Sequence, residues 1–129
     1  MQYNKSLPYL ESGIGIIIAV SHSGYEVEKK MAREVNDLDL VVGGHSHAFL
    51  FSGQPPSKDK PLGPYPTLEK QLSGKIVPVV QAHHCSKYLG YLKMTFTRNG
   101  ELKSWSGSPI LLNSSFTQSM FNITMMSTE

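Results

Sequence analysis

The sequence predicts an α/β fold built around a parallel βαβ unit. Two apolar runs rich in β-branched residues, 14–20 and 38–42, lie on either side of a helical pattern. Such runs are typical of strands buried on both faces of a parallel sheet. A proline-rich stretch and then several further strand patterns follow them. With 129 residues, the chain has room for one small domain with a hydrophobic core.

The segment between the two runs predicts an amphipathic helix of about three turns. Ser23 and Glu26 have the spacing of a capping box, with Ser23 as the N-cap residue. Val27, Met31 and Val35 recur every four residues and mark the expected apolar face. The residues expected to face water are Glu28, Lys29, Arg33 and Glu34.

The second part of the chain predicts a long loop and then β-structure. Residues 49–74 contain five of the eight prolines, which favours an irregular segment, and Lys58, Asp59 and Lys60 are typical of a solvated loop tip. Asn99-Gly100 is a hairpin turn signal. The segments expected to be extended are residues 76–82, 88–97, 101–105 and 109–112. We expect a partial domain over residues 1–115 and a poorly ordered polar tail over 116–129.

Composition excludes several classes of protein. The net charge is +2 and the twelve Lys and Arg residues are scattered, so a nucleic-acid partner is not expected. One cysteine, Cys85, excludes an internal disulfide. No apolar run approaches the roughly 18 residues of a membrane span, and Glu11 before the longest run argues against a signal peptide. Glycosylation sequons begin at Asn4, Asn113 and Asn122 and hint at a secretory route.

Two histidine turns carry the chemistry of the sequence. His22 and His45 each stand just past the expected carboxyl end of a strand. Because the strands of a βαβ unit point the same way, these two side chains should converge at one sheet edge, where ligand sites form. Gly43 and Gly44 allow the backbone to bend closely there.

These histidines predict a possible metal site. The helix that follows His22 disfavours an imidazolium at its N-terminus, and neutral imidazole is the form that binds metal. His47 adds a third nitrogen, and zinc is the default ion. The alternative is a set of hydrogen-bonded structural histidines, and spacing alone leaves it open. For His83, His84 and Cys85 we favour a structural role, because adjacent strand residues point to opposite faces unless the strand breaks.

At these turns the sequence resembles a known family, the ecto-5'-nucleotidases and apyrases, and most of all the animal cell-surface 5'-nucleotidases. The resemblance runs in order from about residue 14 to 115. The segments that carry it are residues 21–26, 39–47, 53–58, 77–82, 87–92 and 109–115. It implies the second half of a metallophosphoesterase-type αββα sandwich, with a βαβ unit, a long proline-rich loop and hairpin strands.

The resemblance also implies a two-metal site, usually zinc, that hydrolyses nucleoside 5'-monophosphates to nucleoside and phosphate. His22 matches the histidine of the family's G-H-S-G turn, and His45 matches the first histidine of G-G-H-S-x; both bind the same ion. His47 stands where relatives carry Asn, Gln or His and contact the other ion. Two cations about 3.5–4 Å apart activate a water molecule and neutralise the phosphoryl oxygens.

Several family features are missing, so no catalytic residue is assigned in this chain. The aspartate-x-histidine motif, the bridging aspartate, the G-N-H-[DE] motif and the nucleobase-stacking domain are all absent. We therefore expect a fragment or truncated product of a secreted or surface enzyme, inactive by itself. The alternatives are apyrase activity on ATP and ADP, or a non-catalytic short isoform that binds a partner or a metal. The resemblance leaves a homodimeric parent open.

Overall fold

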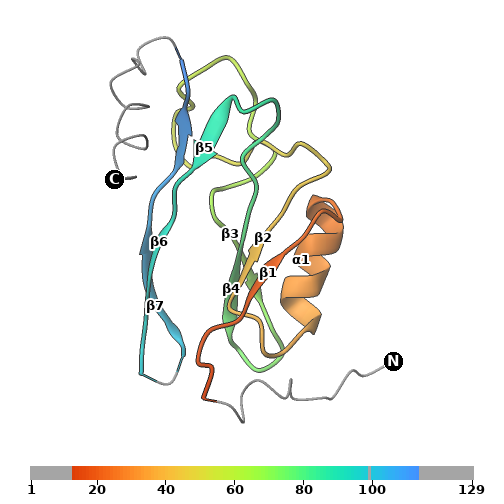
Figure 1. Cartoon of the computed structure of the whole chain (residues 1–129), viewed down its shortest axis with the longest axis vertical. Helices are drawn as coiled ribbons and strands as arrows, with labels where there is room; N and C mark the ends of the chain where they lie inside the picture. The colour runs from red at the N-terminus through yellow and green to blue at the C-terminus, as the bar shows by residue number, and fades with distance from the viewer. Residues whose placement is uncertain (1–12, 99, 114–129) are drawn as a thin grey trace, which may run out of the picture.

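The computed structural model describes residues 13–98 and 100–113. Within these ranges it contains a single helix packed on one side of the strands, which confirms the predicted α/β class (Figure 1). The elements in chain order are β1 Ile18–Val20, α1 Tyr25–Glu34, β2 Leu40–Val42, β3 Thr67–Lys70, β4 Ile76–Val80, β5 Tyr88–Gly90, β6 Lys93–Phe96, β7 Leu102–Ser106 and β8 Pro109–Leu111. The predicted tail over 116–129 and the sequons at Asn4 and Asn122 lie outside the described residues.

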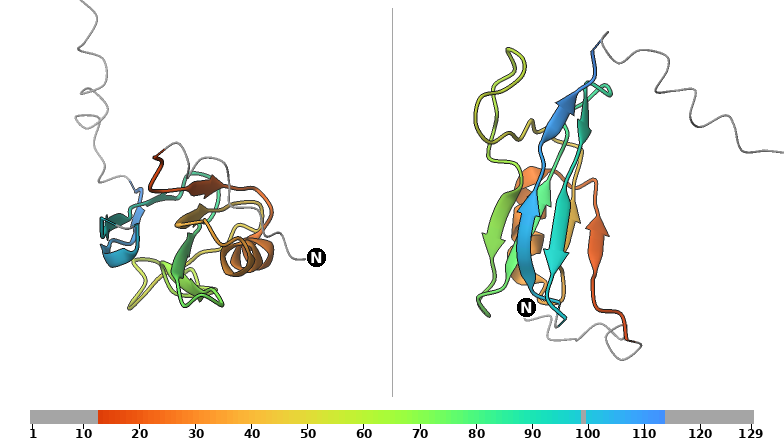
Figure 2. Two further views of the ribbon diagram at one scale, coloured as in Figure 1. Left: turned by 90° about the horizontal axis from the view of Figure 1, so that it is seen from below. Right: turned by 90° about the vertical axis from the view of Figure 1, so that its left-hand side faces the viewer.

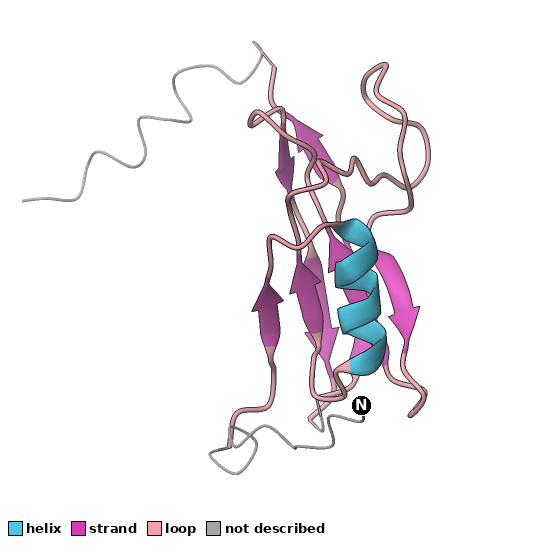
Figure 3. Cartoon of the chain, turned by 90° about the vertical axis from the view of Figure 1, so that its right-hand side faces the viewer, coloured by secondary structure: helices cyan, strands magenta, loops and turns pink. Residues whose placement is uncertain are grey.

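The main sheet has four strands in the order β1-β2-β4-β3. β1 pairs with β2 and β2 with β4 in parallel, so the predicted βαβ unit is confirmed, while β3 runs antiparallel to β4. α1 lies along one face of this sheet (Figure 3), and the β5–β8 and β6–β7 pairs stand on the other side (Figures 1 and 2). The carboxyl ends of the three parallel strands therefore meet at one edge, next to the start of α1.

β3 is a strand that the sequence pattern did not predict. It lies inside residues 49–74, which were expected to be a loop throughout, and pairs with β4 from Thr67 opposite Val79 to Lys70 opposite Ile76. The strand forms because β4 offers an open edge there, a pairing that local composition does not reveal. The proline-rich residues before it are irregular, as predicted.

β1 differs from its prediction in length and in burial. The expected strand over residues 14–20 is reduced to Ile18–Val20. β1 is an edge strand, and Ile18 and Val20 are 53% and 85% exposed. Burial on both faces is therefore wrong for this strand: among the residues that the structure describes, β2 alone pairs with it.

The predicted hairpin is present, but one of the expected strands is divided into two. The expected strand over 88–97 splits into β5 and β6, and β6 pairs antiparallel with β7 across the predicted turn. The amide of Thr97 donates to the carbonyl of Glu101 at 2.8 Å and closes that turn. β8 pairs with β5 in a second antiparallel ladder.

The helix is present, but its start and its buried face differ from the prediction. Gly24 is the N-cap, with a left-handed φ of 92° and no side-chain cap, so the capping box of Ser23 and Glu26 is wrong. Val27 is 52% exposed, whereas Glu28 is completely buried. The face against the sheet consists of Tyr25, Glu28 and Ala32, with Met31 half-buried beside them.

The core fills the space between α1 and the sheet. Its buried residues are Tyr25, Ala32, Leu38, Val41, Ala48, Leu50, Tyr65, Val77, Val79 and Val80. The buried side chain of Gln71, just after β3, closes the far end of the helix. Its Nε2 atom donates to the carbonyls of Ala32 and Val35 at 2.9 and 2.7 Å.

Candidate metal site

The structure brings His22 and His45 together, as predicted. His22 follows β1 and His45 follows β2, and both side chains lie at the carboxyl edge of the sheet. Their ring centroids are 5.2 Å apart, and the rings meet edge to face at 73°. Two imidazoles from turns twenty-three residues apart therefore lie in direct contact.

Glycines allow the two turns to interlock. A Cβ atom added to Gly44 would lie 2.9 Å from Nδ1 of His22, which is closer than a real side chain can approach. On the other side, a Cβ atom at Gly43 would collide with the carboxylate of Glu28. The Gly43-Gly44 backbone is thus packed between that buried carboxylate and the His22 ring, and only glycine fits there.

A buried hydrogen-bond network holds the turns, and its members were missed by sequence reasoning. Oε1 of Glu28 accepts from the amides of Gly24 at 3.2 Å and Gly44 at 3.0 Å. Oε2 of Glu28 accepts from Nε2 of Gln81 at 2.5 Å. Ser46 Oγ accepts from the amide of Tyr25 at 3.0 Å and so provides the first turn of α1 with the acceptor that Ser23 does not.

His47 belongs to a different group. Its ring stacks on His84, with centroids 4.8 Å apart, and His83 lies against His84 at 4.2 Å. Nδ1 of His83 is 2.8 Å from the carbonyl oxygen of His47, to which its N–H donates. The structure therefore does not add His47 to the His22–His45 pair, although only one residue separates it from His45.

The imidazole cluster, defined as His47, His83 and His84, forms because the strand ends before it. β4 stops at Val80, and His83 has a left-handed φ of 65°. The alternation of side chains that would separate neighbouring residues is thereby lost. Burial, and then the neighbouring His83 and His47 rings, lower the pKa of His84. Nδ1 of His84 also lies 3.0 Å from the sulfur of Cys85.

The His22–His45 pair fits a shared metal ion. When two imidazoles bind one zinc ion at about 2.0–2.1 Å, their ring centroids lie roughly 5 Å apart, close to the separation found here. Within residues 13–98 and 100–113, no three His, Cys, Asp or Glu side chains are arranged to hold a metal ion. The described residues thus bring two candidate ligands together and place no third beside them.

Asp59 anchors the proline-rich loop and is not a solvated loop tip. Its Oδ2 atom pairs with the ammonium of Lys87 at 2.5 Å and accepts from the hydroxyl of Tyr88 at 2.7 Å. Ser57 donates to the same oxygen at 2.9 Å. The Lys87 ammonium, followed by these two hydroxyls, holds the pKa of Asp59 well below its usual range.

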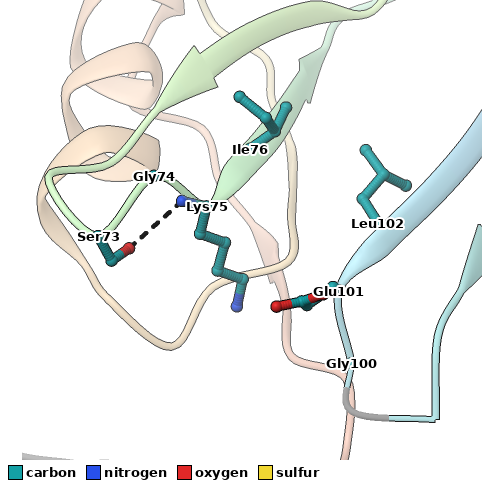
Figure 4. A pocket seen from close by; sticks show the side chains of 7 residues that line it. All are labelled: Ser73, Gly74, Lys75, Ile76, Gly100, Glu101 and Leu102. Carbon is teal, nitrogen blue, oxygen red and sulfur yellow. Dashed lines mark hydrogen bonds between the residues drawn. The ribbon is translucent and has the colours of Figure 1, made fainter.

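One hollow in the described residues lies away from the histidines. The volume of the hollow is about 510 Å³. One side is lined by Ser73, Gly74, Lys75 and Ile76, and the other by Gly100, Glu101 and Leu102 (Figure 4). It is at the start of β4, whereas the histidine turns are at the ends of the parallel strands. The Lys75 ammonium at its rim pairs with Asp39 at 2.8 Å. We assign the hollow no role in the metal site.

No helix within the described ranges is long and apolar enough to cross a membrane. The helix present, α1, has ten residues.

Comparison with known proteins gives the site a family context. The chain is 51% identical over 109 residues to a 5'-nucleotidase of Diplobatis ommata, covering 84% of this chain and 19% of that protein. It is 54% identical over 99 residues to the 5'-nucleotidase of Bos taurus, covering 77% and 17%. The crystal structure of a 5'-nucleotidase precursor from Thermus thermophilus matches with a TM-score of 0.75 and 42% identity, over 80% of this chain and 20% of that one.

The resemblance to the 5'-nucleotidases is confirmed. The structural match also confirms the predicted fold, part of a metallophosphoesterase-type domain. No family model matches the chain. The chain spans about a fifth of the length of the 5'-nucleotidases that it matches.

Proposed function

We propose that this chain forms part of the metal centre of a 5'-nucleotidase, an enzyme that hydrolyses nucleoside 5'-monophosphates to nucleoside and phosphate. The observation that supports this is the contact of His22 and His45 at the carboxyl edge of a parallel sheet, within a chain that is about half identical to named 5'-nucleotidases. In the proposal these two imidazoles bind one divalent ion, with zinc as the expected metal, and His47 faces a second ion.

The chain's own residues would act mainly by placing and orienting ligands. His22 and His45 lie on two turns that the hydrogen bonds to Glu28 hold together, so little order has to be gained when an ion binds. When bound, metal ions in such sites activate water and neutralise phosphoryl oxygens. The backbone of His45 has a left-handed φ of 69°.

We further propose that residues 1–129 alone do not hydrolyse AMP. Among the described residues, two imidazoles converge and no carboxylate is placed to bridge a pair of ions. A purified chain mixed with zinc and AMP should release no phosphate above background. Phosphate release at a rate near that of a full-length 5'-nucleotidase would refute this part of the proposal.

Zinc titration tests the metal ligands directly. Calorimetry of the purified chain should detect one zinc ion per chain, and His22→Ala or His45→Ala should abolish most of the binding. His47→Ala should retain it, because the His47 ring stacks on His84 and not on the pair. Equal zinc uptake by the wild type, His22→Ala and His45→Ala would refute the proposed metal site.

We propose an extracellular or cell-surface location for the parent enzyme. Asn113 is exposed at the end of the described residues and begins a sequon, so a glycan could attach there without entering the core. Expression in a secreting eukaryotic host should give a chain whose mass falls after glycosidase treatment, and Asn113→Gln should remove one glycan. A nucleotide substrate and a homodimeric assembly remain predictions for the parent.

A further inference from the structure

Glu28 is a buried carboxylate with an unusual set of partners. It is fully buried on the sheet side of α1. Every partner that approaches it is an N–H donor: two backbone amides and one side-chain amide. Within the described residues no cationic side chain pairs with it. Because an ionised carboxylate only accepts hydrogen bonds, this set of donors suits the charged form.

The donors come from both histidine turns. The Gly24 amide is two residues after His22, and the Gly44 amide is one residue before His45. A single oxygen atom of Glu28 accepts from both. The position of one carboxylate therefore determines how closely the two turns approach each other.

Gln81 holds the turn that carries His45 through further hydrogen bonds. Besides donating to Glu28, its Nε2 atom donates to the carbonyl of Gly44 at 2.8 Å. Its Oε1 atom accepts from the amide of Ala48 at 3.0 Å and from the hydroxyl of Ser46 at 3.2 Å. The turn that carries His45 is thus held at several points by two buried side chains.

The mechanical link to the imidazoles is short. The Gly43-Gly44 backbone lies between the Glu28 carboxylate on one side and the His22 ring on the other. On the opposite turn, a Cβ atom on Gly24 would lie 3.6 Å from Cδ2 of the His45 ring. A shift of the carboxylate would therefore move Gly44, which lies against the His22 ring, and Gly24, which lies beside the His45 ring.

Charge adds to this geometry. Buried charges are costly unless they are paired or hydrogen-bonded, and the first turn of α1 and the three N–H donors offset part of the cost. A divalent cation bound by the nearby imidazoles would be attracted by a negative charge on Glu28. Glu28 thus has both a geometric and an electrostatic way to strengthen metal binding.

We infer that Glu28 is a positioning residue of the metal centre, whose buried carboxylate sets the contact between His22 and His45 and raises their affinity for a cation. The inference rests on the proposed function for its metal. The effect of Glu28 on the placement of the two rings does not depend on the proposed function, because it can be measured in the zinc-free chain.

The test compares the wild-type chain with Glu28→Gln, which keeps the shape of the side chain but removes its charge and presents an NH₂ group to Nε2 of Gln81. Zinc affinity should fall by about tenfold, a typical effect of losing a group that orients metal ligands. In the zinc-free chain, the nuclear Overhauser contacts between the His22 and His45 rings should weaken. The Glu28→Gln/Gln81→Glu double variant restores a donor facing an acceptor and should recover both quantities in part.

Two further variants separate positioning from stability. Val77→Ala removes buried volume from β4 away from the turns, and should lower the melting temperature while leaving zinc affinity and the ring contacts unchanged. If Glu28→Gln does not fold, Glu28→Asp keeps the charge but withdraws it by one methylene group, and should weaken the ring contacts and lower zinc affinity by a smaller factor.

The outcomes distinguish the two proposals. Zinc binding by the wild type, with equal affinity and equal ring contacts in the folded Glu28 variants, would overturn the inference and leave the proposed metal site intact. No zinc binding by the wild type, with ring contacts that weaken in Glu28→Gln, would overturn the metal site and leave the positioning role standing. A loss of zinc affinity in Val77→Ala as large as in Glu28→Gln would reduce the role of Glu28 to fold stability.

Discussion

Glu28 and Asp59 are both carboxylates at the centre of a hydrogen-bond network, but their surroundings differ. Glu28 is fully buried and accepts from amide N–H groups alone. The Asp59 side chain is 24% exposed and has an ammonium and two hydroxyls around one oxygen. The first network joins two turns that carry candidate ligands, and the second fixes a long loop to β5.

The difference shows what burial does to the same chemical group. At Asp59, water can replace a lost partner, so the contribution of each contact to stability is small. At Glu28, a lost partner leaves a buried polar group without a substitute, which is far more costly. Changes around Glu28 should therefore affect both stability and the site, whereas changes around Asp59 should have a smaller effect on stability and leave the site unchanged.

The largest effect is expected for Gly43→Ala. The new methyl group would overlap the Glu28 carboxylate, so either the turn or the carboxylate must move. Overpacking together with weakened buried hydrogen bonds should lower the free energy of unfolding by roughly 3 kcal/mol. Urea unfolding measures this. Gly15→Ala is the matched control, because a Cβ atom there meets nothing within 4 Å, and a similar loss in both variants would contradict the explanation.

A smaller effect is expected at the start of α1. Ser46→Ala removes the acceptor of the Tyr25 amide and should cost about 1 kcal/mol, a typical value for the loss of a helix cap. Ser23→Ala should change stability by less than about 0.5 kcal/mol, because the exposed Ser23 bonds through its hydroxyl to the Ser21 hydroxyl and does not cap the helix. Thermal unfolding of both variants compares them. A larger loss of stability in Ser23→Ala than in Ser46→Ala would show that Ser23 caps the helix, as the sequence predicted.

The smallest effect is expected for Asp59→Asn, and it depends on pH. The pKa of Asp59 is lowered in the folded chain, first of all by the Lys87 ammonium. Its contribution is therefore present above the pKa of the unfolded chain, about 3.9, and is lost as pH falls from there toward the folded value. The melting temperatures of the wild type and Asp59→Asn should differ at pH 7, and the difference should shrink as the pH falls below about 4. A constant difference between pH 7 and the lowest pH at which both chains fold would show that the charge is not involved.

The elements that local pattern determines were predicted well. The β-branched runs gave β2 and the core of β1, and the hairpin signal gave the β6–β7 pair, because in both cases neighbours in sequence carry the information. β3 was missed because its stability comes from an edge of β4. The apolar stripe of α1 was misplaced because Val27 has the right spacing but faces away from the sheet.

For the candidate site, the sequence predicted that the two candidate ligands converge, but it did not reveal the residues that hold them. The convergence of His22 and His45 follows from parallel strands, so the βαβ pattern was sufficient. The role of Glu28 could not be predicted, since a charged residue on an amphipathic helix normally faces water. The grouping of His47 with His84 depends on left-handed residues after β4 that no local rule specified.

Gln71 has a consequence for the motions of the domain. Gln71 directly follows β3, and its side chain binds two carbonyls at the C-terminal end of α1. The helix cannot unwind from that end without leaving a buried amide unpaired, and β3 cannot detach without freeing those carbonyls. The C-terminal turn of α1 and β3 should therefore open together as one cooperative unit, while the exposed edge strand β1 fluctuates independently of them.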